Sequence, residues 1–453
     1  MSKHLKRGFQ GLALLPLVAV AGTAYAQEAA PSVEDLDQRI KVLERQLEIQ
    51  KEESDAKAKD SATVSANEKG FSIKSAKGDY EFKFRGLLQA DGRWFVDDKA
   101  PRTGDGFLMR RVEPTFELTL GKALFFRIQP NFGKDSPEVS DVYGEWRIDP
   151  AFYARAGKFK APVVLENLQA SSATVFNERG FPTELGPNRD IGLQFGGAFL
   201  SSTTTYALGV FNGAPDGRDG TQQSGSTNSS GDNRKEVAAR LFTEPFKNSP
   251  GLFQGLGLGV GGSYGEKLGN GDSSQVKYRT PGQNTFFNYQ TAVTYDGAET
   301  RISPQAYYYR NSFGLLAEYI VAKQEVANAA AHEKLDNKAW QAVANYLLTG
   351  EDASYTGLTK PKNSITQGGV GAWELVARYG VLDVDNDAFT NKTYADITKS
   401  ASKATTWAAG ANWYPINNLK IALTYSQTSF DGGATTGDRE DEKLLFTRFQ
   451  VAF

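Results

Sequence analysis

The chain has 453 residues, of which 40% are hydrophobic and 12% aromatic, with a mean hydropathy of −0.45 and a formal charge of −2. After residue 26 no stretch approaches the run of about eighteen apolar residues that a membrane-spanning helix needs, which excludes such a helix from the mature chain. Cysteine is absent and the histidines are His4 and His332, which excludes disulfides and leaves little for triad-type catalysis. We therefore expect no enzyme, no cofactor and no metal, and the negative net charge predicts no nucleic-acid partner.

Residues 1–26 have the three parts of a secretory signal peptide. Lys3, Lys6 and Arg7 supply the positive charge, and an apolar stretch follows from Leu12 to Ala21. The small-residue pattern Ala24-Tyr25-Ala26 marks the cleavage site. The sequence therefore predicts export, with residues 1–26 removed. An uncleaved anchor helix is the alternative, and the shortness of the apolar stretch argues against it.

Residues 27–53 contain a heptad-like pattern. Apolar residues step by three and four along this segment: Val33, Leu36, Ile40, Leu43 and Leu47. The pattern predicts a helix that forms a coiled coil, which is short and would need an attached oligomer for stability. A solvated amphipathic helix without a partner is the alternative. Residues 54–70 are rich in Lys, Asp, Ser and Ala, which predicts a linker.

From Tyr80 onward the period of the apolar residues changes to two. One face of each segment is mostly apolar and aromatic, whereas the other carries charges such as Arg111, Glu113 and Glu117. A soluble β-sandwich also alternates, but the aromatic apolar face and the charged second face favour lipid on one side and water on the other. The predicted fold class for residues 71–453 is therefore all-β, a transmembrane antiparallel β-barrel.

The connections between these segments alternate in length. Long stretches rich in Gly, Asn, Ser and Asp occur between tight turns such as 310–312 and 415–418; they lie at 213–233, 265–284, 383–403 and 431–442. Outer-membrane barrels have this asymmetry, and their even strand numbers favour about sixteen strands here, with 285–295 as a hairpin inside a long loop. The last strand ends at Phe453 and must pair with the first, because lipid leaves an open strand edge without hydrogen-bond partners.

Several segments resemble, in the same order, the phosphate-selective porin O and P family. The resemblance covers about 71–453, and the N-terminal coiled coil also recurs in this family. Its clearest stretches are FRGLLQADGRW at 84–94, MRRVEPTFE at 109–117, VYGEWRIDPAFYARAGKFKAP at 142–162, LENLQASSATVFNER at 165–179, SPQAYYYRNSFGLLAEY at 303–319, AWQAVANYLLTGEDA at 339–353, GAWELVARY at 371–379 and TRFQVAF at 447–453.

The resemblance implies a porin in the outer membrane of a Gram-negative bacterium, a homotrimer of lipid-embedded barrels that are each narrowed by an inward-folded third outer loop at about 161–189. It also implies passive diffusion of small anions, such as phosphate, pyrophosphate or polyphosphate, through an arginine-lined pore. Within that loop Arg179 matches the family's constriction arginine, and Arg110 with Arg111 matches its paired arginines on the second strand.

Other basic residues extend this candidate set. Arg85, Arg93 and Arg127 lie on the charged faces of their segments, and Lys158 and Lys160 lead into the third loop. Arginine suits an anion path because its planar guanidinium matches phosphate oxygens and stays charged at all working pH values. Acidic residues share these faces, so we expect some of these arginines to be structural ion-pair partners.

The chain departs from the family pattern at positions that bear on selectivity. Asn167 and Ser172 stand where phosphate-specific members have lysines in the third loop. Leu87 aligns with a pore arginine and Asn131 with a pore aspartate. These departures favour the alternative function, a general porin of weak selectivity for small organic solutes.

Overall fold

The computed structural model describes residues 32–96, 104–133, 137–220, 234–269, 276–358 and 360–453. The predicted signal peptide, 1–26, lies outside the described residues. The chain divides into two compact units, Met1–Asp60 and Ser61–Phe453, and each is described by itself.

The first unit contains the helix α1 (Val33–Asp60), and Ser32 caps it by accepting a hydrogen bond of 3.2 Å from the backbone N–H of Asp35. The linker predicted for 54–70 needs correction, because the helix continues to Asp60 and a strand follows at Thr63. Two Ala and two Lys favour a helix over residues 54–60, and neither Gly nor Pro interrupts this segment. Among the described residues, no helix is long and apolar enough to span a membrane.

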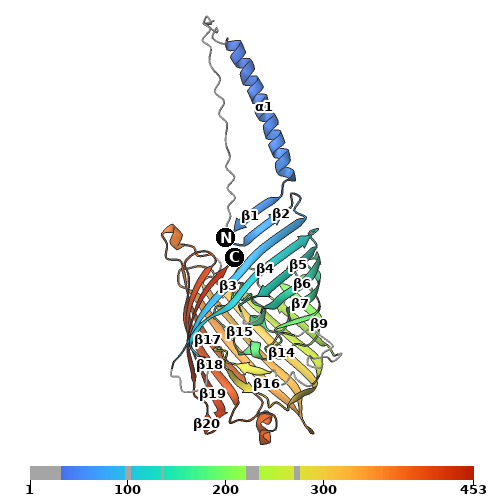
Figure 1. Ribbon diagram of the computed structural model, residues 1–453, viewed down its shortest axis with the longest axis vertical. Coiled ribbons are helices and arrows are strands. Elements are labelled where there is room, and N and C mark those ends of the chain that lie inside the picture. The colour runs from blue at the N-terminus through green and yellow to red at the C-terminus, as the bar shows by residue number, and fades with distance from the viewer. Residues whose placement is uncertain (1–31, 97–103, 134–136, 221–233, 270–275, 359) are drawn as a thin grey trace, which may run out of the picture. The chain divides into compact units, whose positions relative to one another are not determined.

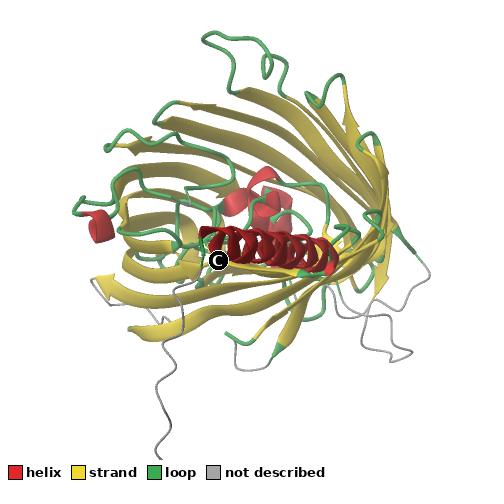
Figure 2. Cartoon of the chain, turned by 90° about the horizontal axis from the view of Figure 1, so that it is seen from above, coloured by secondary structure: helices red, strands yellow, loops and turns green. Residues whose placement is uncertain are grey.

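The second unit is an antiparallel barrel with sixteen strands in its described part (Figure 1). Each strand pairs with the next along the chain, and the last pairs with the first, so the ring is closed (Figure 2). The predicted fold class is confirmed. The barrel strands are β3 (Tyr80–Val96), β4 (Gly106–Leu120), β5 (Leu124–Asn131), β6 (Glu138–Asp149), β7 (Phe152–Lys160), β8 (Arg189–Phe199), β9 (Thr204–Phe211), β10 (Glu236–Thr243), β11 (Leu256–Gly269), β14 (Thr294–Arg310), β15 (Phe313–Asn328), β16 (Ala331–Leu347), β17 (Ala372–Asp383), β18 (Ala401–Tyr414), β19 (Leu419–Ala434) and β21 (Glu442–Ala452).

The connections differ between the two ends of the barrel. At one end Asn311 and Asn418 turn the chain with positive φ angles of 50° and 68°, in the tight turns that the sequence predicts. The long connection between β11 and β14 lies at the other end and contains a separate hairpin, β12 (Lys277–Arg279) and β13 (Thr285–Asn288). The predicted hairpin at 285–295 is therefore corrected: a hairpin does lie inside this long loop, but Thr285–Asn288 is its second strand and pairs with Lys277–Arg279, whereas Thr294 already belongs to the barrel. Another short strand, β20 (Gly437–Asp438), pairs with the end of β19.

A second hairpin covers the seam where the barrel closes. Its strands β1 (Thr63–Asn67) and β2 (Gly70–Lys74) extend the sheet beside the first part of β3, and β21 pairs with the remainder of β3. Phe453 and Gly86 exchange two backbone hydrogen bonds of 3.0 Å. Further along β3 from Gly86, Arg448 of β21 forms a buried bidentate pair with Asp91, at 2.6 and 2.7 Å. This pair fixes the register of closure, because a slip would leave both charges buried and unpaired.

The outward face of the strands is apolar, and the inward face is divided. Exposed side chains such as Phe126, Trp146 and Leu241 form a surface suited to lipid. Inside, residues of β14–β18 and of the inward-folded loops pack in a hydrophobic core that includes Ile320 and Leu382. Figure 2 shows loop segments inside the ring of strands. Inward residues of β3–β8 are mostly polar and charged, so the polar cavities lie on that side.

Candidate functional site

The connection between β7 and β8, residues 161–188, folds into the barrel and is called the inward loop below. It contains the helix α2 (Leu165–Leu168) and the 3-10 helix η1 (Phe181–Glu184), and most of it is buried. A buried loop is stable only when protein groups replace water as partners of its backbone. Wall side chains do this by donating to its carbonyl groups: Gln89 to Ser171, Gln450 to Ser172, Lys420 to Thr174, Asn412 to Val175 and Arg378 to Glu178.

Glu166 anchors the inward loop to the wall formed by β16 and β17. Its carboxylate accepts hydrogen bonds from Arg378 at 2.6 Å, from Gln341 at 2.7 Å and from the backbone N–H of Gly180 at 2.8 Å. Arg378 also donates to the carbonyl of Glu178. The residue between Glu178 and Gly180 is Arg179, so this anchor fixes the point from which the Arg179 side chain starts.

Arg110 and Arg111 both face the lumen although they are consecutive on β4. The pairing with β3 shifts at this point, since Gln89 pairs with Arg111 whereas Ala90 pairs with Met109. This β-bulge turns Arg110 inward, where strict alternation would direct it to lipid. Arg110 then forms a bidentate pair with Glu178, at 2.5 and 2.9 Å, and Arg111 donates to Gln89 Oε1 at 2.7 Å.

Glu178 is the central carboxylate of this cluster. Besides Arg110, the guanidinium groups of Arg93 and Arg448 lie 3.2 and 3.8 Å from it. Burial alone would raise the pKa of Glu178, but Arg110, together with Arg111 and Arg448, outweighs burial and holds that pKa well below its usual range. Glu178 is therefore ionised and cancels part of the positive charge around it.

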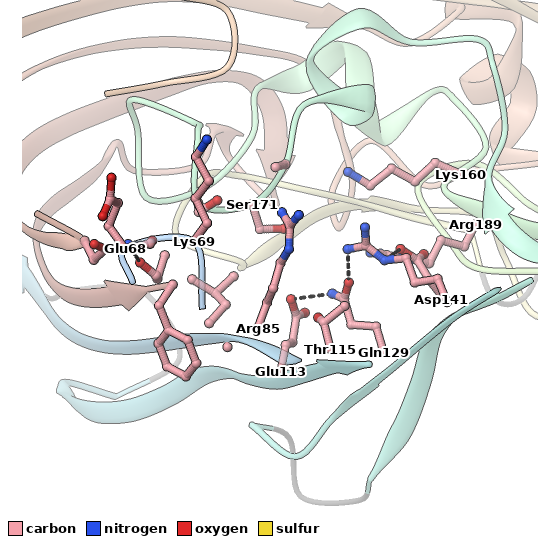
Figure 3. A pocket seen from close by; sticks show the side chains of 18 residues that line it. Glu68, Lys69, Arg85, Glu113, Thr115, Gln129, Asp141, Lys160, Ser171 and Arg189 are labelled. Carbon is pink, nitrogen blue, oxygen red and sulfur yellow. Dashed lines mark hydrogen bonds and ion pairs between the residues drawn. The ribbon is translucent and has the colours of Figure 1, made fainter. Parts of the chain in front are cut away.

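Two neighbouring cavities lie between the inward loop and strands β3–β8. The first has a volume of about 300 Å³, and Arg85 and Lys160 extend into its space (Figure 3). The second has a volume of about 200 Å³, and its basic lining residues are Arg110, Arg111, Arg179, Arg189 and Arg279. Glu113 and Arg189 line both cavities, so the two meet at these side chains.

Carboxylates compensate several of the predicted pore cations. Arg85 and Arg127 each lie 3.3 Å from Glu117, and Lys158 lies 3.2 Å from Asp219. The Arg93 side chain is only 8% exposed and contacts Glu178 of the inward loop. The expectation that Arg93 contacts passing anions is therefore corrected: its alternation toward the lumen is as predicted, but the loop covers it and it braces that loop.

Besides Lys69 at the first cavity, three cations line the cavities without an ion pair to any carboxylate in the part of the chain that the structure describes. Arg179 donates to the carbonyls of Glu166 and Gln169, at 3.1 and 3.0 Å. Lys160 donates to the Gln169 carbonyl at 2.6 Å. The Arg279 guanidinium reaches the Gln283 side chain at 3.4 Å. Neutral carbonyls orient these groups without cancelling their charge, so the junction of the cavities keeps a positive potential.

Glu184 adds a titratable group to the second cavity. Its carboxylate accepts a hydrogen bond of 3.0 Å from the backbone N–H of Arg279. Burial raises the pKa of Glu184 to about 7, although the positive charge of Arg279 opposes the rise. The charge of the second cavity therefore changes near neutral pH.

Sequence reasoning missed Arg189 and Arg279 as lining residues. Arg189 begins β8 and pairs with Asp141 at 2.7 Å. Its position at the end of the predicted third loop could have identified it as a candidate pore residue. Arg279 lies on the β12–β13 hairpin, and the sequence carries no periodicity that tells an inward-folded hairpin from a solvated one.

A closed barrel with an apolar outer face and charged cavities inside defines a membrane channel of the outer-membrane type. The chain belongs to the phosphate-selective porin O and P family, whose model matches residues 82–453. It is an outer-membrane porin of a Gram-negative bacterium, and the predicted family and localisation are confirmed.

Individual relatives agree with this assignment. Porin O of Pseudomonas aeruginosa is 24% identical over 420 residues, which cover 85% of this chain and 91% of that protein. The outer membrane channel DcaP of Acinetobacter baumannii has a TM-score of 0.53 at 12% identity, over 85% of this chain and 99% of that chain. OmpT of Vibrio cholerae has a TM-score of 0.51 at 11% identity, over 83% of this chain and 98% of that chain. At such identities the two solved structures bear on the fold alone.

Proposed function

We propose that this porin conducts small anions, phosphate and polyphosphate among them, by passive diffusion through the two cavities along β3–β8. The observation that carries the proposal is the group of cations at the cavities with no carboxylate partner among the described residues, which includes Arg179, Lys160 and Arg279. A few such charges in a low-dielectric wall concentrate anions locally even in a chain with a net negative charge. The family description supports phosphate as the anion.

The lining residues define a stepwise route. From the end with the long connections, an anion meets Arg279 and Arg179 in the second cavity, passes Arg189 at the junction and reaches Lys160 in the first cavity. Conduction requires binding that is favourable enough for entry and weak enough for release. Carboxylates along the route, such as Glu113 at the junction, limit how strongly an anion is held.

Planar-bilayer recording of the purified protein tests the proposal. In a KCl gradient the reversal potential should show anion selectivity, and added phosphate should block the chloride current. Arg179→Gln should raise the half-blocking phosphate concentration about tenfold, since a charge-assisted hydrogen bond contributes about 1.5–3 kcal/mol. The matched control is the double variant Lys158→Gln with Asp219→Asn, which removes one charge of each sign beside the second cavity. Cation preference of the unaltered channel would refute anion conduction.

A general porin of weak selectivity is the second candidate. It is favoured by the pairing of Arg85 and Arg127 with Glu117 and by the absence of lysine at Asn167 and Ser172. This candidate predicts a small anion preference and no phosphate block at millimolar concentration. The same recordings therefore separate the two functions.

We further propose a homotrimer in which α1 contributes to association. Its apolar residues at three- and four-residue steps are exposed, among them Val33, Ile40 and Leu47. Such a stripe is too short for a stable coiled coil alone but gains from attachment to an assembled barrel. Deleting residues 28–60 should lower trimer stability in detergent, measured by native mass, and leave single-channel conductance unchanged. Loss of conductance in folded trimers would assign α1 to the channel itself.

A further inference from the structure

A third chamber, which we call the alcove, lies beside the first cavity and has a volume of about 400 Å³. Its walls come from β7–β10 and its cover from Pro162 and Leu168 of the inward loop. Pro150, in the turn between β6 and β7, also lines it, so the alcove lies toward the end of the barrel with the short turns. Lys160 lines both the alcove and the first cavity, which places the alcove next to the proposed anion route.

The alcove differs from the two pore cavities in charge. Its charged lining residues are Arg155, Lys160 and Arg240, and none of the residues that line it is an aspartate or glutamate. Arg155 is compensated by an ion pair with Glu145, outside the alcove. Lys160 and Arg240 form no ion pair with the described carboxylates. The alcove therefore holds net positive charge, whereas acidic residues line both other cavities.

The Arg240 side chain is held in place by its neighbours, but part of its guanidinium group has no hydrogen-bond partner among the described residues. Its Nε donates to Gln305 Oε1 at 2.9 Å, and its guanidinium lies 4.4 Å from the ring centroid of Phe242. The terminal nitrogens form no hydrogen bond with the described residues. An arginine held by one neutral partner and one ring face presents its remaining donors in a fixed direction, which suits a carboxylate or phosphate.

The rest of the alcove is apolar and has room for a compact ligand. Ala198, Thr205 and Ala207 are small side chains on β8 and β9, and Tyr153 offers an aromatic face. The Tyr153 hydroxyl is held by Gln194 Nε2 at 2.7 Å, so the ring is fixed in place. Ligand pockets typically have volumes of about 300–1,000 Å³ and combine apolar walls with a few placed polar groups.

We propose that the alcove binds organic anions that join a phosphate or carboxylate group to a compact apolar body. The anionic group lies at Arg240 and Lys160, and the apolar body packs against Tyr153 and the small side chains of β8 and β9. This inference rests on the proposed anion conduction and extends it, because it assigns a class of solute that inorganic phosphate does not represent. The second cavity, with its acidic and polar lining, offers no such apolar wall. In the first cavity, apolar residues such as Leu87 and Phe453 share the lining with the carboxylates of Glu113 and Asp141.

The test compares two phosphate monoesters of equal charge as blockers of the chloride current through the full-length channel. Phenyl phosphate should half-block at a concentration about tenfold lower than methyl phosphate, since binding removes part of the apolar ring from water. Arg240→Gln keeps a side chain near Gln305 but removes the charge, and Ala207→Phe fills the space. Each variant should bring the ratio of the two half-blocking concentrations close to one.

Matched controls separate the alcove from general effects on the pore. Arg85→Gln removes a positive charge from the first cavity and should weaken both blockers by the same factor, so the ratio stays. Leu208→Phe adds the same ring on the lipid-facing side of β9 and should change neither blocker. A ratio near one in the unaltered channel, or a ratio that survives both Arg240→Gln and Ala207→Phe, overturns the alcove. Absence of block by inorganic phosphate with the ratio intact overturns phosphate conduction and leaves the alcove standing.

Discussion

Two clusters of charged residues inside the same barrel use arginine in opposite ways. Around Arg301, which is fully buried, the guanidinium contacts Asp216 and Glu236 at 2.8 Å and Glu299 at 2.7 Å. Around Arg179 the partners are neutral carbonyls of the inward loop. In the first cluster the carboxylates neutralise the charge of Arg301. In the second cluster the charge of Arg179 is not neutralised and can attract an incoming anion. The partners of an arginine, more than its position on the lumen face, decide whether it serves structure or transport.

The largest effect should come from breaking the cluster around Arg301. Arg301→Leu leaves Asp216, Glu236 and Glu299 buried without their main partner, and removal of one member of a buried charge network costs about 3–5 kcal/mol. The unfolding midpoint followed by circular dichroism in detergent should fall sharply, while Arg301→Lys, which keeps the charge, should fall less. An unchanged midpoint in Arg301→Leu would show that this cluster does not stabilise the barrel.

A second change removes the carboxylate partner of two arginines. Glu178→Gln removes the carboxylate that compensates Arg110 and Arg93, so more positive charge remains beside the second cavity. Anion selectivity should rise, and the half-blocking phosphate concentration should fall about threefold to tenfold, at the expense of a less firmly held inward loop. The readout is the reversal potential together with the open-channel noise. A fall in anion selectivity would contradict the role given to Glu178.

A third, smaller effect concerns pH. The raised pKa of Glu184, about 7, means that this group is mostly neutral at pH 6 and mostly charged at pH 8. Neutralising the Glu184 carboxylate removes one negative charge, so the second cavity becomes more positive as pH falls. Anion selectivity should therefore be higher at pH 6 than at pH 8, by about twofold in permeability ratio for one charge in a partly screened site. Glu184→Gln should flatten this dependence and keep the high-selectivity value.

The smallest effect should come from an ion pair outside both clusters. Lys323 and Asp336 lie 2.9 Å apart on neighbouring strands, with side chains 50% and 32% exposed. Lys323→Ala should change the unfolding free energy by less than about 1 kcal/mol, because water already solvates such pairs. Its reversal potential should match that of the unaltered channel. A shift as large as that of Arg179→Gln would mean that distant surface charge, and not the junction, sets selectivity.

Much of the barrel follows from a period-two pattern, since the hydrophobic effect sorts lipid-facing from inward-facing residues strand by strand. That pattern correctly assigns Arg111 and Glu113 to the lumen and Phe116 to lipid. It cannot place Arg110, because a β-bulge reverses the direction of one side chain without a signature in residue type. The family resemblance, and not the pattern, supplied Arg110 as a candidate.

The period-two pattern also does not predict which arginines of the site have carboxylate partners, and the reason is different. Whether Arg93 or Arg179 is compensated depends on groups contributed by segments that are distant in the sequence or by the fold of the inward loop, such as Glu178 for Arg93. Those contacts arise only once the inward loop folds into the barrel and its carbonyls find donors on the wall. The same holds for Arg279, whose place beside the loop depends on how the β12–β13 hairpin packs.

The reversal potential in a KCl gradient tests the central claim most directly, when it is compared between two double variants. Arg179→Gln with Lys160→Gln removes two uncompensated charges, one from each cavity, whereas Lys158→Gln with Asp219→Asn removes a balanced pair beside the second cavity. We expect the first variant to lose most of its anion selectivity and the second to keep the value of the unaltered channel. Equal shifts in both variants, or full anion selectivity in the first, would contradict the claim that uncompensated cations at the junction select the ion.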